Sequence, residues 1–378
     1  MVEIIFWLAV LGAGYSYLLY PLILIIIVAV RPERNVAWDA GATREISVII
    51  TAHNEAARIR EKITDTLALL GSRQGEVIVV SDASNDGTDE IVAGIRDSRV
   101  RLVRQESRDG KESGQRLGIS SAKGDILVFS DVATRIAPGS LEALLAAFDD
   151  PTVGAVSSED RFVTSDGRLV GEGLYVRYEM WLRRLESRLA GLVGLSGSFF
   201  AARRKVCEHW RTDTPSDFTV ALTCVRLGLR AVSNPDVVGI YTDLKQPADE
   251  YRRKRRTVVR GIAGLVTFRE VLNPVRYGWF AFEAWSHKLL RWAVPWFLVL
   301  VFVSSGVLAT ANPWYGAFFA VQVVGYMLVA AAWFWPALRS IGLIRIAHYF
   351  VLVNVALADG LVRYLRGERI VTWNPSRR

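Results

Sequence analysis

Cysteine is scarce in this chain of 378 residues, which contains only Cys207 and Cys224. Two cysteines exclude a disulfide framework, and their spacing matches no metal-binding pattern. The chain also has no internal repeat and no low-complexity segment, so repeat arrays and biased linkers are excluded. A reducing, cytosolic environment for the soluble part is the simplest interpretation.

Acidic residues are in deficit, with 38 Asp and Glu against 46 Lys and Arg and a formal net charge of +8. A basic chain suits anionic lipid surfaces or phosphate-bearing substrates. No nucleic acid partner is expected, because 51% of the residues are hydrophobic and the mean hydropathy is positive. This composition predicts one large soluble domain together with membrane segments.

The N-terminal stretch 4–30 is almost free of charge and is long enough to cross a hydrocarbon core of about 30 Å. It exceeds the apolar region of a signal peptide and lacks a small-residue cleavage site, so we predict a retained anchor. Arg31 and Arg34 follow it directly. By the positive-inside rule, the next domain is expected on the cytoplasmic side of the inner (plasma) membrane, after a short polar linker at 35–44.

A run of β-favouring residues at 77–80 ends in a loop rich in Asp, Ser, Asn and Gly. Helical spacing resumes after the loop, with Thr88 as the expected N-cap. A strand, a polar loop and a helix form a βα unit, and ligands of open α/β sheets bind beyond the carboxyl ends of the strands. Asp82 is therefore expected where a ligand would bind, although the same pattern also fits an ordinary solvated turn.

Two other apolar runs end in the same way, because 45–51 is followed by Glu55 and 125–130 by Asp131. Strands that alternate with helices indicate a mostly parallel α/β sheet. We expect Glu55, Asp82 and Asp131 to converge on one rim of that sheet. We also expect a helix that carries Ile59, Ile63, Leu67 and Leu70 on one apolar stripe. A second helix is expected at 139–148 and a further strand at 153–158.

From Gly173 onward, long helical stretches with basic and aromatic residues replace the alternating pattern. Residues 196–202, with the sequence SGSFFAA, are expected to form a small-residue loop, and another helix is expected to begin at Asp217. Segment 252–260 carries six basic residues. Segment 272–292 is amphipathic and rich in Trp, which is typical of an interfacial helix.

Three further apolar segments follow, at 293–311, 314–335 and 344–362. Three crossings would place the C-terminal arginines outside the cell, against the positive-inside rule. The last segment also contains Asn354 and Asp359, which are unfavourable in lipid unless they are paired. We therefore predict two full crossings and a last segment that is interfacial or re-entrant.

The sequence SVIITAHNE, the loop DASNDGT and a strand that ends at Asp131 together resemble family 2 glycosyltransferases. These are inverting enzymes with a GT-A fold, a Rossmann-like and mostly parallel α/β domain, that use nucleotide-activated sugars. The resemblance covers about residues 45–260. The flanking apolar segments resemble the membrane-bound branch that builds polysaccharides, which includes the cellulose, hyaluronan and poly-N-acetylglucosamine synthases.

The resemblance implies five parts in this chain. They are an N-terminal transmembrane anchor at 1–34, a GT-A glycosyltransferase domain at 43–245, basic and amphipathic interfacial helices at 246–292, C-terminal membrane helices at 293–365 and a basic tail at 366–378. The implied partners are a nucleotide-sugar donor, a lipid-linked or polysaccharide acceptor and membrane lipids.

The same resemblance implies a nucleotide pocket at the first two strand ends. Ala52, His53 and Glu55 would line the pocket. Asp82 matches the second acid of the family's DDGS motif and would contact the uracil of a UDP-sugar, while Ser81 replaces the first acid.

Further donor contacts are implied downstream. Lys111, in GKESGQRLG, matches the family's Gly-Lys pair before a helix. Asp131 matches the first acid of the DxD motif, which implies Mg²⁺ or Mn²⁺, but Ala133 replaces the second acid, which is normally the direct metal ligand. Arg253 and Arg256 resemble the Q-x-x-R part of the QxxRW motif.

The implied catalytic residue is Asp217, in TPSDF, which matches the last acid of the family's ED or DD motif. Inverting transfer needs one general base to deprotonate the acceptor hydroxyl, and a carboxylate at a helix N-terminus is well held for this role. An N-cap without catalytic function is the simpler alternative. Gly197 and Ser198 fall in the loop that usually faces the acceptor.

Three functions are open on this basis. The first is sugar transfer to a lipid-linked or growing glycan. The second is a processive polysaccharide synthase, which is disfavoured because Thr257 stands where Trp is expected and few membrane helices are available for a channel. The third is an inactive nucleotide-binding partner of a glycan export complex, which Ser81 and Ala133 support and which Lys111 and Asp217 oppose.

Overall fold

The computed structural model describes residues 1–31, 44–163, 174–242 and 247–370, which form two compact units. The helical unit comprises Met1–Ile23, Lys245–Ala263 and Ala284–Arg369. The rest of the described chain forms the sheet unit. The predicted linker at 35–44, except Arg44, and the last eight residues of the predicted basic tail lie outside the described residues.

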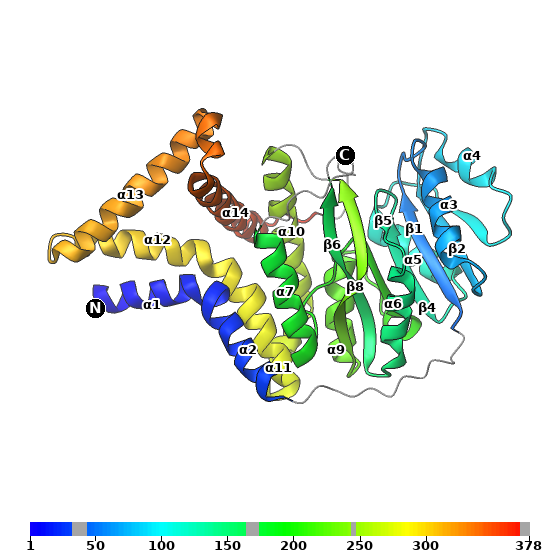
Figure 1. The fold of residues 1–378 in the computed structure, drawn as a ribbon, viewed down its shortest axis with the longest axis horizontal. Helices are drawn as coiled ribbons and strands as arrows, with labels where there is room; N and C mark the ends of the chain where they lie inside the picture. Colours follow the sequence, from blue (N-terminus) through cyan, green and yellow to red (C-terminus); the bar gives the residue numbers. More distant parts are fainter. Residues whose placement is uncertain (32–43, 164–173, 243–246, 371–378) are drawn as a thin grey trace. The chain divides into compact units, whose positions relative to one another are not determined.

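The sheet unit contains one eight-stranded mixed sheet with the order β3-β2-β1-β4-β7-β6-β8-β5 (Figure 1). The first four strands are parallel, whereas β7 runs antiparallel to both β4 and β6. The strands are β1 Ile46–Ala52, β2 Gly75–Asp82, β3 Val100–Gln105, β4 Ile126–Asp131, β5 Arg135–Ile136, β6 Val153–Val163, β7 Phe199–Arg203 and β8 Arg230–Thr242.

The register of the central strands brings the predicted rim together. Thr51 of β1 pairs with Val80 of β2 on one side and with Asp131 of β4 on the other. Since all three strands run in the same direction, their carboxyl ends are level. The predicted convergence of the strand ends at one rim is therefore confirmed.

Helices cover both faces of the sheet because the strand side chains alternate in direction. Val48 and Ile50 belong to the core on one face, whereas Ile49 belongs to the core on the other. The first face is covered by α3 Ile59–Leu70, α4 Thr88–Ala93 and α6 Ser140–Ala146, and the second by α5 Lys111–Ser121, α8 Arg204–Cys207 and α9 Ser216–Arg226. The result is a three-layer α/β domain.

Two local predictions are wrong. Residues 199–202 of the expected loop at 196–202 instead belong to strand β7, which pairs with β4 in the middle of the sheet. Thr88 is the first residue of α4 and not its cap. The N-cap is Gly87, and the Asp86 carboxylate before it accepts hydrogen bonds from the Thr88 N–H and hydroxyl.

Among the described residues, four helical stretches are long and apolar enough to cross a membrane: Val2–Val30, Pro274–Leu308, Pro313–Phe334 and Gly342–Leu365. The first contains α1 Val2–Gly14 and α2 Tyr20–Val30, and the second contains α11 Pro274–Ala284 and α12 Leu290–Leu308. The expected interfacial helix at 272–292 thus continues into α12 without a break at 292. The third and fourth are α13 and α14.

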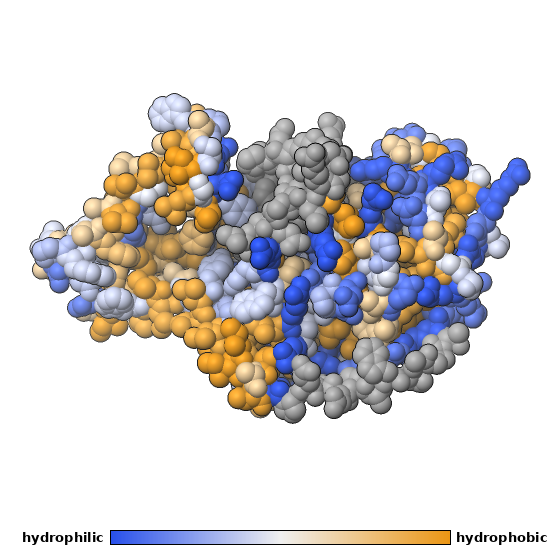
Figure 2. All heavy atoms as spheres, viewed as in Figure 1, coloured by the Kyte–Doolittle hydropathy of each residue, from blue (hydrophilic) through white to orange (hydrophobic). Residues whose placement is uncertain are grey.

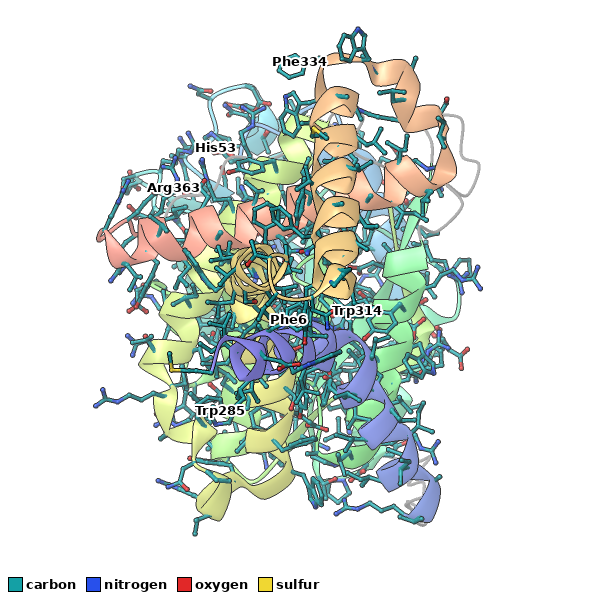
Figure 3. The ribbon with its side chains drawn as sticks, turned by 90° about the vertical axis from the view of Figure 1, so that its left-hand side faces the viewer. Phe6, His53, Trp285, Trp314, Phe334 and Arg363 are labelled. Atoms are coloured by element: carbon teal, nitrogen blue, oxygen red, sulfur yellow. The ribbon has the colours of Figure 1, made fainter. Side chains whose placement is uncertain are left out.

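Aromatic residues join α1 to α13 in the helical unit. The ring of Phe6 lies 5.1 Å from Tyr315 and 6.3 Å from Trp314, and Figure 3 shows Phe6 and Trp314 side by side. Hydrophobic side chains cover much of the surface of α12 and α13 (Figure 2), including the exposed Val303 and Val321. Such a surface suits a hydrocarbon environment.

Asp359 and the amide nitrogen of Asn354, both on α14, have hydrogen-bond partners. Asp359 accepts hydrogen bonds from Tyr251 of α10 Pro247–Thr267 and from Arg363, and the amide of Asn354 donates to the carbonyl of Phe350. Pairing lowers the cost of placing these groups in or near lipid. Whether α14 crosses the membrane or lies at its surface stays a prediction.

Candidate active site

Two loops interlock beyond the ends of β1 and β2. The Glu55 N–H donates to the Thr88 hydroxyl at 2.9 Å, and the Ala56 N–H donates to the Asp86 carboxylate at 3.0 Å. Burial raises the pKa of Asp86, but the hydrogen bonds from Thr88 and Ala56 outweigh burial and bring this pKa below its ordinary value. Asp86 therefore remains ionised and fixes both loops.

Each of these strand ends carries a residue in the left-handed region. Asn54 has φ of 55° and Ala83 has φ of 51°. Asn tolerates this region, whereas an alanine adopts it at a cost of about 1–2 kcal/mol. Strained backbone that persists at the carboxyl edge of a sheet is typical of ligand-binding loops.

Asp82 lies at the end of β2 and is almost completely buried. Its carboxylate accepts hydrogen bonds from the Asp109 N–H at 2.9 Å, from the Gly110 N–H at 3.2 Å and from the Gln105 amide at 3.1 Å. Asp82 thus holds the loop that leads into α5. Its predicted contact with a uracil stays a prediction.

His53 is fixed by the backbone of the neighbouring strand. Its Nδ1 lies 2.6 Å from the Asp82 carbonyl oxygen. Because a carbonyl oxygen only accepts, this contact requires a proton on Nδ1. Ala52, also predicted to line the pocket, is the buried last residue of β1.

Lys111 and Asp131 form the centre of the site. The Lys111 ammonium donates to Asp131 Oδ1 at 2.5 Å and to the Gly197 carbonyl at 2.7 Å. The Asp131 N–H donates to the Ser198 carbonyl at 2.9 Å. Three predicted parts of the site, namely the lysine, the first DxD acid and the acceptor loop, are therefore in direct contact.

Asp217 lies in the first turn of α9 and faces the same loop. Its backbone carbonyl accepts from the Leu195 N–H at 3.0 Å, and its Oδ1 accepts from the Phe218 N–H at 3.0 Å. A Cβ atom at Gly197 would lie 2.8 Å from Asp217 Oδ2, so glycine is required for this close approach. Gly197 thereby lies between Lys111 and Asp217.

Glu55 contributes to the electrostatics of the rim. Burial raises its pKa, Arg58 opposes this through an ion pair of 2.7 Å, and Asp131 and Asp86 add to the increase. The net effect is a pKa above the ordinary value. The influence of Asp131 on this group reflects the expected clustering of acids at the rim.

Lys62 on α3 was not singled out from the sequence. Its ammonium is buried and donates to the Ser130 hydroxyl and to the Thr134 carbonyl, both at 2.7 Å. Burial lowers its pKa to about 8, although Asp131 and Asp65 oppose the change. The sequence could have indicated this buried charge, because Lys62 follows Ile59 by three residues and therefore lies on the apolar stripe of α3.

Arg253 and Arg256 lie on α10, in the helical unit, and their side chains are half-buried. Their predicted contact with the donor stays a prediction. In the part of the chain that the structure describes, the contacts of the site come from the sheet unit.

The residues at Asp131 fit a divalent ion only in part. No group of three or more His, Cys, Asp or Glu that could hold a metal occurs among the described residues, and Ala133 offers no ligand. Asp131 Oδ1 is paired with Lys111, whereas Oδ2 has no protein hydrogen bond in the described chain. Mg²⁺ commonly binds through one or two carboxylates together with substrate phosphates and water. Asp131 therefore fits an ion that arrives with a diphosphate.

The whole chain shares its fold with a solved glycosyltransferase. The mannosyltransferase PcManGT from Pyrobaculum calidifontis, solved with GDP-Man and Mn²⁺, matches with a TM-score of 0.74 and 24% identity, over 98% of this chain and 100% of that chain. This protein thus has a GT-A fold with flanking apolar helices.

The sequence comparisons concern part of the chain. The model of "Glycosyl transferase family 2" matches residues 47–211, which are less than half of the chain. The succinoglycan biosynthesis protein ExoO of Rhizobium meliloti is 32% identical over 33% of this chain and 35% of its own length. The poly-β-1,6-N-acetyl-D-glucosamine synthase of Staphylococcus aureus is 26% identical over 48% of this chain and 45% of its own length. The chain spans less than half the length of these curated relatives.

Proposed function

We propose that this protein is an inverting hexosyltransferase. It moves a sugar from a UDP-sugar to a lipid-linked or growing glycan at the cytoplasmic face of the inner membrane. The observation that carries the proposal is the position of Gly197. Its carbonyl accepts a hydrogen bond from Lys111, and its Cα, which carries no side chain, lies close to the carboxylate of Asp217. A cation for the leaving group and a base for the acceptor thus lie on two sides of one glycine.

Asp217 is the proposed general base. Its Oδ1 is engaged by the Phe218 N–H, whereas Oδ2 has no hydrogen bond within the described residues and faces Gly197. The free oxygen takes the proton from an acceptor hydroxyl as that oxygen attacks the anomeric carbon. The C–O bond to the diphosphate breaks on the opposite face of the sugar, which inverts the configuration.

Positive charge must meet the diphosphate as this bond breaks. Lys111 is the proposed source within the site, and Arg253 and Arg256 are proposed to contribute from α10. A divalent ion bound with the donor would add Lewis-acid stabilisation of the leaving diphosphate, and Asp131 would hold it.

The donor half of the site is proposed from the strand ends. His53, Asp82 and Glu55 surround the position of the nucleotide, and Gly197 with Ser198 lines the acceptor side. The cytoplasmic orientation rests on Arg31, which directly follows the first apolar helix.

The test uses full-length protein in detergent with a panel of UDP- and GDP-sugars, GDP-mannose included, and measures released nucleotide. Release from a UDP-sugar that depends on added acceptor and is lost in Asp217→Asn is the expected result. NMR of the product should show an inverted anomeric centre. Binding of UDP without any turnover would instead identify an inactive nucleotide-binding partner.

A processive synthase is the second candidate, because one of the relatives is named as a synthase of a poly-β-1,6-linked polymer. Product length separates the two. Transfer of one or a few sugars supports the first function, whereas long polymers formed before the acceptor is exhausted support the second.

A further inference from the structure

β6 and β8 continue beyond the rim of the sheet as a parallel pair. Ser157 of β6 is level with Phe200 of β7, which begins at the rim, and β6 then extends to Val163 beside β8 (Figure 1). Asp160 lies on this extension and is opposite Gly239 of β8. Asp160 therefore lies at the same end of the sheet as the candidate site, beyond the carboxyl ends of the central strands.

Hydroxyl groups hold one oxygen of Asp160. Its Oδ1 accepts hydrogen bonds from the Ser196 hydroxyl at 2.6 Å and from the Tyr241 hydroxyl at 2.9 Å. Both donors are buried. Burial, and then the charge of Asp160, raises the pKa of Tyr241 well above its ordinary value, so this hydroxyl keeps its proton.

The backbone is shaped around this network. A Cβ atom at Gly239 would lie 2.6 Å from the Tyr241 hydroxyl, so the strand leaves room for the phenol only because position 239 is glycine. The Ser196 N–H is held by the Ser157 hydroxyl at 2.7 Å. The orientation of Asp160 is thus fixed by Tyr241 of β8 and by Ser196 of the acceptor loop, which Ser157 of β6 holds in turn.

The acceptor loop links Asp160 to the proposed base. Ser196 contacts Asp160, and the next residue, Gly197, contacts Asp217. Because adjacent Cα atoms are about 3.8 Å apart, the two carboxylates lie within roughly 13 Å of each other. One acceptor sugar, or two linked sugars, can therefore reach both.

Asp160 has no cationic partner among the described residues. The neighbouring acid, Glu159, pairs with Arg184 at 2.6 Å. Asp160 instead accepts only hydroxyl donors, and its Oδ2 has no hydrogen bond in the described part of the chain. Asp160 is only partly buried. An oriented carboxylate oxygen without a hydrogen bond, beside the proposed acceptor loop, can accept one from a further hydroxyl group.

We infer that Asp160 binds a hydroxyl group of the acceptor, and that the acceptor end that enters the site is a saccharide and not a bare phosphate. The inference rests on the proposed function and specifies its acceptor. A fixed negative charge attracts hydroxyl donors, whereas it repels the dianion of a phosphate monoester. Asp160 is thus a specificity-determining residue, and Tyr241 and Ser196 position it.

The test compares alkyl glycosides, such as octyl β-D-glucoside and the corresponding N-acetylglucosaminide, with dodecyl phosphate as acceptors. The full-length protein should use a glycoside and not the phosphate. Asp160→Ala should raise the acceptor KM by about 10- to 100-fold, the usual effect of removing a charged hydrogen-bond partner. UDP affinity should stay unchanged. Asp236→Asn, an exposed acid on β8, is the matched control and should change neither.

Asp160→Asn keeps the shape of the side chain and removes the charge, and it serves where the alanine variant fails to fold. It should shift the preference toward dodecyl phosphate, which a purely structural role would not do. Transfer to the phosphate but to no glycoside, or an unchanged acceptor KM in both variants, overturns the inference. If the unmodified protein binds no UDP, the proposed function itself has failed, and the acceptor assignment fails with it.

Discussion

The proposed donor side and the proposed acceptor side differ in how most of their acidic residues are bonded, with Asp131, which has one paired and one open oxygen, as the exception. On the donor side, the carboxylates of Asp82 and Asp86 accept hydrogen bonds from loop N–H groups, and Glu55 is paired with Arg58. On the acceptor side, Asp160 and Asp217 each keep one carboxylate oxygen without a hydrogen bond in the described chain.

We infer from this difference that acids near one rim have distinct roles. A carboxylate saturated by backbone donors is a structural element that shapes the pocket, since its removal leaves buried N–H groups unpaired. A carboxylate with an open oxygen can accept a proton or bind a hydroxyl. Removing acids from the two sides should therefore give different kinetic results.

The largest effect is expected at Asp217. Asp217→Asn keeps the hydrogen bond to the Phe218 N–H but removes the base, so turnover should fall by about 10²-fold or more while UDP affinity stays unchanged. Steady-state kinetics and calorimetry measure both quantities. Asp213→Asn, an exposed acid in the preceding loop that pairs with Arg211, is the matched control. Near-normal turnover in Asp217→Asn would refute the assignment.

The next effect is expected at Asp82. Asp82→Ala should weaken UDP binding by about 1–3 kcal/mol, because the loop at 105–110 loses its anchor and its N–H groups lose their acceptor. Calorimetry with UDP measures the change. Asp97→Ala removes a surface ion pair with Arg99 and should have little effect. Unchanged affinity in Asp82→Ala would count against a nucleotide pocket at this strand end.

Metal binding tests the donor side further. Asp131 offers one open oxygen, so Mg²⁺ or Mn²⁺ should bind weakly alone and at least about fivefold more tightly with UDP, and metal should raise UDP affinity by the same factor. Titrations with and without UDP, and activity in EDTA, measure this coupling.

Ala133→Asp restores the second acid and should raise metal affinity in the absence of UDP. Full activity after chelation would contradict the metal assignment. It would shift the stabilisation of the leaving group to Lys111 and to the arginines at 252–256.

Much of the donor side could be predicted from the sequence. Buried strands that end in an acid occur within contiguous segments, and their parallel order brings Asp82 and Asp131 to one rim. The βα pattern therefore predicted the fold class and the rim at which these two acids meet. The interlocking of the loops through Asp86 could not be predicted, because a polar loop does not show which acceptor each N–H will find.

The acceptor side depends on pairing between distant segments. β7 was mistaken for a loop because its antiparallel position beside β4 follows from contacts with residues about 70 positions earlier. The contact of Asp160 with Tyr241 joins residues 81 positions apart. No local pattern marks such pairs, which is why the sequence gives no sign of this network.

The smallest effect is expected at Lys62. This residue lies next to β4 on the donor side, and its ammonium group is buried. Burial lowers its pKa to about 8, from an ordinary value of 10.5. Between these values the unfolded chain binds more protons than the folded chain, so the free energy of unfolding should rise with pH. The rise from this group should be about 1 kcal/mol between pH 7 and pH 9.

Thermal or urea unfolding in EDTA, without nucleotide, measures the pH dependence in the full-length protein. Lys62→Met removes the titrating group, so the difference in stability between it and the unmodified protein should change by about 1 kcal/mol over this range. Lys123→Met replaces an exposed lysine and should leave the pH dependence unchanged. If the free energy of unfolding changes with pH in the same way for Lys62→Met and the unmodified protein, Lys62 titrates as an ordinary lysine. The turn at 130–134 would then be held by its hydrogen bonds to Lys62 without a buried charge of altered pKa.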